Sequence, residues 1–140
     1  MEEPVAFYAC HCTDCQRRTG SAFALSMIVR REHLEVLSGA PASYEAVLSD
    51  GRREAGCLCA TCGTRLWAYS KRPDFAVVQP GTLVQPSGLE PVAHLWMCEA
   101  QPWFVPKSGI KQYEKQPDQP GELAVLWQEA HEAREPRSGA

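Results

Sequence analysis

Two cysteine triplets with the same spacing constrain this chain more than any other feature. They occur in the segments ACHCTDC and GCLCATC, and they contain six of the seven cysteines: Cys10, Cys12, Cys15, Cys57, Cys59 and Cys62. In an extended segment, residues two apart project to the same face, so the first two thiolates of each triplet can point at one site. A turn can add the third thiolate. The pattern predicts metal binding, and zinc is the commonest ion that prefers sulfur in tetrahedral geometry.

The number of thiolates at each site decides what a bound metal could do there. Three thiolates leave one position of a tetrahedral zinc ion open, which is typical of a catalytic site. Four thiolates close the site, and the metal then only stabilises the fold. The spacing also allows one closed site built from Cys12, Cys15, Cys59 and Cys62.

Composition narrows the class of protein. The chain has 140 residues, 44% of them hydrophobic, and a formal net charge of -3, which favours one domain and argues against a nucleic-acid partner. The amino terminus MEEPVAFY carries acidic residues where a signal peptide needs basic ones. No stretch approaches the roughly 18 apolar residues of a membrane helix. We therefore expect a cytoplasmic protein without a membrane partner, whose thiols stay reduced and available to a metal.

Short runs of β-branched and aromatic residues predict a mainly β, antiparallel architecture. Turn sequences such as SGAP, SDG and QPSG separate these runs. The predicted strands cover residues 23–30, 34–37, 43–48, 64–70, 75–79 and 92–98.

Only the C-terminal region has a helical pattern. Leu123, Leu126, Trp127 and Ala130 follow the i, i+3, i+4, i+7 spacing of one helix face, which predicts a helix over residues 122–134. We expect residues 1–116 to form the zinc-binding domain. Residues 117–140 are then a proline-containing linker, the helix and a disordered tail over residues 135–140.

The two triplets have different surroundings. Gly63 follows Cys62, and a glycine after a CxxC turn permits the positive φ of a zinc knuckle. The first triplet is followed by Arg17 and Arg18, which could offset the negative charge of zinc with three thiolates or bind a substrate carboxylate. Exposure to solvent, with no role at the site, is an equally good interpretation for either arginine.

Two histidines belong to the same motifs. His11 lies between two cysteines and should point to the opposite face of a strand, so we expect it behind the ligands or at the surface. His94 and Trp96 share one face of the predicted strand 92–98, where an aromatic core cluster is a better interpretation than a general base.

Three motifs taken in order resemble the family of glutathione-dependent formaldehyde-activating enzymes, which includes centromere protein V. They are CHCTDCQRRTGSAFA, CATCGTRLW and HLWMCEAQPW, and the match runs from about Tyr8 to Trp103. The resemblance implies a zinc-stapled, mainly β fold of folded antiparallel sheets of the Mss-four-like type. It also implies a carbon–sulfur lyase that joins formaldehyde to glutathione.

The resemblance assigns roles to individual residues. It implies a catalytic zinc at Cys10, Cys12 and Cys15, and half of a structural zinc site at Cys59 and Cys62. The family's other structural pair is a CxC upstream of the catalytic triplet, and this chain has only nine residues before Cys10, so it is N-terminally short relative to the family.

Two sulfurs could replace the upstream pair: Cys57, which places the whole second triplet among the candidate ligands, or Cys98. We therefore expect one or two zinc ions per chain. Glutathione or another small thiol is the expected partner. The alternative is a zinc-stapled binding module without catalytic activity, in which protein ligands fill every metal position and the partner is another protein.

Overall fold

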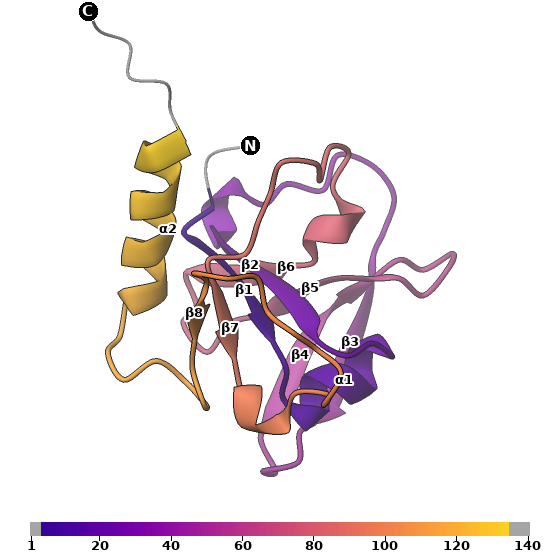
Figure 1. Ribbon diagram of the computed structural model, residues 1–140. Coiled ribbons are helices and arrows are strands. Elements are labelled where there is room, and N and C mark those ends of the chain that lie inside the picture. The colour runs from indigo at the N-terminus through magenta and orange to yellow at the C-terminus, as the bar shows by residue number, and fades with distance from the viewer. Residues whose placement is uncertain (1–3, 135–140) are drawn as a thin grey trace, which may run out of the picture.

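The computed structural model describes residues 4–134 as a mainly β fold with one longer helix (Figure 1). Eight strands form one mixed sheet in the order β3-β4-β5-β6-β2-β1-β7-β8. The strands are β1 (Ala6–Cys10), β2 (Ala24–Arg30), β3 (Ala42–Val47), β4 (Arg53–Leu58), β5 (Arg65–Tyr69), β6 (Phe75–Val78), β7 (Ala93–Leu95) and β8 (Lys111–Gln112). The helices are α1 (Thr13–Thr19) and α2 (Glu122–Arg134). The expected fold class, mainly β with a C-terminal helix, is confirmed.

The sheet is antiparallel from β3 to β1 and parallel beyond β1. Ala9 pairs with His94 where β1 meets β7, and β7 in turn runs parallel to β8. Parallel neighbours need a crossover connection rather than a hairpin. Here the long segment between β6 and β7 makes the crossover. It places His94 of β7 beside β1, the strand that ends in Cys10.

Two of the expected strands differ from the structure. Residues 34–37 form no strand, and the side chains of Val36 and Leu37 are 47% and 86% exposed, so this prediction was wrong. A β-rich run becomes a strand only where a neighbouring strand can pair with it. The expected strand 92–98 ends at Leu95, because Trp96 adopts a left-handed conformation with φ of 59° and begins a 3₁₀ helix.

The hydrophobic core joins β1, β2 and β6 to α2. Phe7, Met27, Val78 and Trp127 belong to one buried cluster, and the rings of Phe7 and Trp127 meet edge to face at 6.1 Å. Figure 1 shows α2 along one side of the molecule and α1 away from it, next to β3 and β4. The expected tail over residues 135–140 lies outside the described residues. Within residues 4–134, no helix has the length and apolar character needed to span a bilayer.

Candidate metal centre

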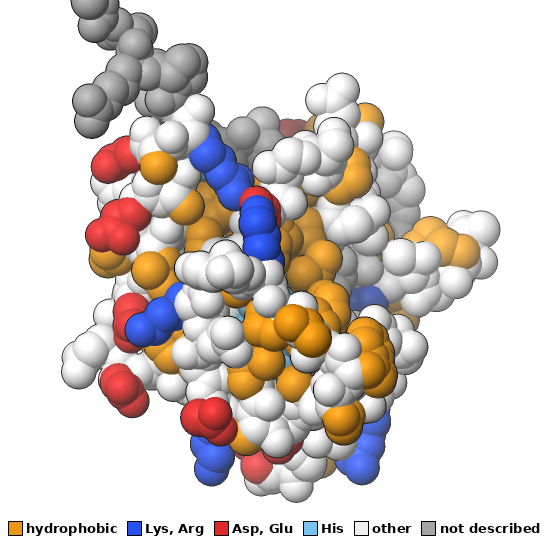
Figure 2. Space-filling model, viewed as in Figure 1, with side chains coloured by type: hydrophobic (Ala, Val, Ile, Leu, Met, Phe, Trp, Pro, Cys, Tyr) orange, Lys and Arg blue, Asp and Glu red, His pale blue; other side chains and the backbone are white. Residues whose placement is uncertain are grey.

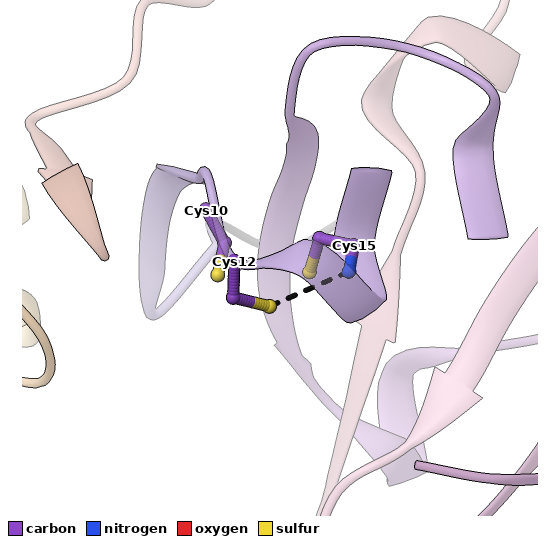
Figure 3. Close-up of side chains that lie close together, drawn as sticks. All are labelled: Cys10, Cys12 and Cys15. Atoms are coloured by element: carbon purple, nitrogen blue, oxygen red, sulfur yellow. Dashed lines mark hydrogen bonds between the residues drawn. The ribbon is translucent and has the colours of Figure 1, made fainter. Parts of the chain in front are cut away.

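The first cysteine triplet forms a cluster at the junction of β1 and α1. Cys10 is the last residue of β1, Cys12 is the N-cap of α1, and Cys15 lies in its first turn. Their sulfur atoms lie within 4.8 Å of one another (Figure 3). The chain thus turns from strand to helix directly after Cys12, and that turn brings in the third sulfur.

Local hydrogen bonds favour a thiolate on Cys12. Its Sγ accepts a hydrogen bond from the backbone N–H of Cys15 at 3.4 Å, as the oxygen of an N-cap residue would. The hydrogen bond from the Cys10 thiol, followed by that from Cys15, lowers the pKa of Cys12 far below its ordinary value. The pKa of Cys10 is raised, chiefly because its thiol donates to Cys12. Both shifts favour the thiolate on Cys12 over a thiolate on Cys10.

The three sulfurs fit a soft tetrahedral metal ion. Zinc–sulfur bonds of about 2.3 Å in a tetrahedron place the sulfur atoms about 3.8 Å apart. The observed spacing within 4.8 Å requires only small side-chain adjustments. Cys12 and Cys15 are partly exposed, whereas Cys10 is buried, so the cluster is accessible from one side.

Hydrogen bonds to the 3₁₀ helix Met97–Glu99 hold the loop of the first cysteine triplet in place. The carboxylate of Glu99 accepts from the backbone N–H of Thr13 at 2.5 Å and from its hydroxyl at 2.8 Å. The amide nitrogen of Gln16 donates to the carbonyl oxygens of His11 and Glu99 at 2.7 and 2.9 Å. The 3₁₀ helix that follows β7 thus holds the segment that carries the first triplet.

His11 is fully buried behind the cluster, which excludes the surface position that the sequence also allowed. Its Nε2 lies 2.8 Å from Nδ1 of His94, and both rings pack against Phe23 and Phe104. Burial, followed by the charge of His94, lowers the pKa of His11 to about 4. Burial also lowers the pKa of His94, and the pair closes the apolar side of the loop.

The segment that carries Phe104 also contributes to the molecular surface. Trp103 is 69% exposed and Val105 is 83% exposed, and hydrophobic side chains gather on the face that this segment crosses (Figure 2). Trp103 and Val105 therefore face solvent, while Phe104 between them covers the histidine pair.

The two candidate substrate arginines have different environments. Arg17 is exposed, and its guanidinium makes no ion pair among residues 4–134. Arg18 is mostly buried: it forms an ion pair with Glu54 and donates to the Tyr44 hydroxyl at 2.8 Å. Arg17 is thus the more accessible of the two to a substrate carboxylate.

The second triplet does not assemble as the first does. Cys57 is buried, with its Sγ 3.6 Å from the Tyr69 hydroxyl. Cys59 and Cys62 form a knuckle-like turn, in which the N–H of Gly63 donates to the Cys59 carbonyl at 2.8 Å and φ of Gly63 is 73°. No third histidine, cysteine or carboxylate ligand joins this pair among the described residues. The same holds for the four-sulfur arrangement of Cys12, Cys15, Cys59 and Cys62.

Sequence reasoning missed two residues of this region. Glu99 follows the exposed Cys98 in the 3₁₀ helix, and only its place in the third motif marked it. Arg65 begins β5 and pairs with Glu54, which also pairs with Arg18 of α1. Only its place in the second motif marked it, because it lies fifty positions after Cys15.

A comparison with known protein families identifies one match. The family model described as glutathione-dependent formaldehyde-activating enzyme matches residues 1–99, which include both cysteine triplets and His94. No individual curated protein matches the chain. Because the family match covers well over half of the 140 residues, the chain belongs to the family of glutathione-dependent formaldehyde-activating enzymes.

Proposed function

We propose that the protein is a zinc-dependent carbon–sulfur lyase that acts on the adduct of a small thiol and an aldehyde. One observation carries the proposal: three cysteine sulfurs converge within 4.8 Å, and no fourth protein ligand joins them among residues 4–134. The family supports glutathione as the thiol and formaldehyde as the aldehyde.

The residues present fit zinc better than a hard cation, because all three donors are sulfur. Cys10, Cys12 and Cys15 would hold it. When bound, zinc would supply a Lewis acid with one position open to a soft ligand. Three thiolate ligands make zinc a weaker acid than three histidines would, which favours exchange of a bound water for a sulfur ligand.

The reaction is an addition without oxidation or reduction. The thiol sulfur forms a bond to the carbonyl carbon of formaldehyde, and the thiol proton passes to the carbonyl oxygen. The product is the S-hydroxymethyl thiol, and the lyase direction reverses these steps. Arg17, exposed on α1, and the more buried Arg18 are the proposed partners of the carboxylates of glutathione. A reducing cytoplasm would suit this site, since all seven cysteines are free thiols.

The test is a titration of the cobalt-substituted protein. Cobalt bound to Cys10, Cys12 and Cys15 should give sulfur-to-cobalt charge-transfer absorption, and added glutathione should increase it as a fourth sulfur binds. Oxidised glutathione is the matched control, because it carries the same carboxylates without a thiol.

A spectrum that already corresponds to four sulfurs, and that glutathione does not change, would show a closed site. The protein would then be a zinc-stapled binding module rather than an enzyme.

A further inference from the structure

His11 lies directly between two of the three cysteines of the metal centre, and both of its backbone polar groups are held. Its N–H donates to the carbonyl oxygen of Leu95 at 2.9 Å, and its carbonyl oxygen accepts from Nε2 of Gln16 at 2.7 Å. The first bond fixes the peptide plane that joins His11 to Cys10, and the second fixes the plane that joins it to Cys12. The conformation of His11 therefore decides how the two flanking sulfurs are presented.

The ring of His11 is held by His94 of β7. Nε2 of His11 lies 2.8 Å from Nδ1 of His94, and the two side chains belong to the buried polar residues of the molecule. The rings of Phe23 and Phe104 enclose the His11 ring, with centroids 4.9 and 4.6 Å away. The aromatic rings leave the imidazole little room, and His94 is the polar partner that sets its direction.

The position of the proton between the two imidazole rings follows from the nitrogen that remains. Nδ1 of His11 is buried and has no hydrogen-bond partner among residues 4–134. Buried donors without an acceptor are rarer in proteins than buried acceptors without a donor. His11 therefore carries its proton on Nε2 and donates it to Nδ1 of His94. The proton of His94 then lies on its own Nε2, which is not buried without a partner.

This arrangement bears directly on the metal ligands. The sulfurs of Cys10, Cys12 and Cys15 lie within 4.8 Å of one another. Ligands that are already held in the bound arrangement bind a metal more tightly, because less conformational freedom is lost on binding. His11 contributes to that arrangement from behind, through the two peptide groups that it shares with Cys10 and Cys12.

We propose that His94 is a positioning residue of the metal centre. By accepting the hydrogen bond from Nε2 of His11, it keeps Cys10 and Cys12 in the arrangement that binds zinc. The inference rests on the zinc ion of the proposed function, but not on the lyase reaction.

The experiment compares three variants of the full chain. His94→Phe keeps a ring of similar size but removes the acceptor, and should weaken zinc binding about tenfold, as loss of a hydrogen-bond partner behind a metal ligand does. His94→Asn should bind zinc as the wild type does, because its side-chain oxygen can take the place of Nδ1. Val78→Ala is the control, because Val78 of β6 lies in the buried core cluster. It should lower the stability of the fold and leave the zinc affinity unchanged.

Zinc affinity is measured by competition with a chelator, after circular dichroism has shown that each variant is folded. Nitrogen-15 NMR of the imidazole rings in the wild type measures the proton position, because protonated and unprotonated ring nitrogens resonate far apart. We expect His11 to be protonated on Nε2 and unprotonated on Nδ1. A merely structural role of His94 would change stability without this pattern of zinc affinities.

Unchanged zinc affinity in His94→Phe would overturn the inference. So would equal losses in His94→Phe and His94→Asn, since the ring rather than the hydrogen bond would then matter, and so would a proton on Nδ1 of His11. If His94→Phe does not fold, the NMR spectrum and His94→Asn still decide, because weaker zinc binding in His94→Asn would contradict the role of the hydrogen bond.

The outcomes separate the role of His94 from the proposed function. If the wild type binds zinc but the cobalt-substituted protein takes up no glutathione, the lyase is rejected and the role of His94 stands. If the wild type binds no zinc, both proposals are rejected.

Discussion

Gly56 shows how closely a single residue can be tied to packing. It lies in β4, opposite Tyr44 on β3 and Ala68 on β5. A Cβ atom at this position would meet the backbone oxygen of Trp67 and would come within 2.7 Å of the Tyr44 ring and hydroxyl. A glycine weakens an isolated strand, but here it permits a close approach of three neighbours. The absence of a side chain at Gly56 also leaves room for the Tyr44 hydroxyl, which accepts a hydrogen bond from Arg18.

We predict that Gly56→Ala lowers the free energy of unfolding by about 2–3 kcal/mol, because the added methyl group overpacks a site bounded partly by backbone. Urea unfolding measures the change. Gly81→Ala is the control, since nothing lies within 4 Å of the position that its added methyl group would take and its φ is not left-handed; its effect should stay within about 0.5 kcal/mol. Equal effects of the two substitutions would contradict the packing argument.

At the scale of elements, α2 packs against the sheet more closely than the proline-containing linker before it suggested. The expected bounds of this helix agree with the structure. The boundary at residue 117 remains a prediction, but Trp127 is only 5% exposed and packs on Phe7 of β1. The prolines before the helix by themselves predict that removal of residues 117–140 leaves the core folded. The burial of Trp127 instead predicts that this truncation destabilises the core.

We expect Trp127→Ala to lower the free energy of unfolding by about 3–5 kcal/mol, because it leaves a large cavity between α2 and β1. Thermal or urea unfolding measures it. Val125→Ala, on the same helix but at a residue that is 55% exposed, should change stability by less than about 0.5 kcal/mol. If Trp127→Ala unfolds with the same free energy as the wild type, α2 is not needed for the stability of the core, as the prolines before the helix suggest.

The short helix α1 was not expected from the sequence. Its seven residues TDCQRRT contain no apolar stripe, and none of its side chains is fully buried. Its ends explain why it forms: Cys12 caps the first turn, and Gly20 ends the helix with a left-handed φ of 65°. Asp14 near the start, with Arg17 and Arg18 near the end, complements the helix dipole.

For the whole molecule, the two triplets make different predictions for metal content. The first brings three sulfurs together, whereas Cys59 and Cys62 form a pair without a third ligand among residues 4–134. We therefore predict one tightly bound zinc ion per chain.

Native mass spectrometry of the purified chain measures this content directly. Cys12→Ser should lose the zinc ion, because two sulfurs bind it far more weakly than three. Cys62→Ser, at an exposed cysteine, should retain it. Two zinc ions in the wild type and one in Cys62→Ser would show that the knuckle is a second site, with ligands beyond those that the structure brings together.

The sequence by itself determined the features that depend on neighbours along the chain. The spacing of Cys10, Cys12 and Cys15 is short enough that one strand end and one turn bring their sulfurs together. Local turn signals also predicted most of the strands, and the apolar spacing predicted α2. The family motifs carried the same local information, and the family match confirms them.

Only the tertiary structure decided what surrounds the cysteines. Alternation along a strand predicted that His11 points away from the ligands, but the crossover that places β7 beside β1 decided that it is buried against His94. Sheet pairing likewise brought Glu54 and Arg65 beneath α1. The same spacing around Cys57 gave no cluster, because β4 continues to Leu58 and no helix follows to bring in the third sulfur. These contacts join residues that are distant in the chain, and their free energy depends on burial and charge that no local pattern records.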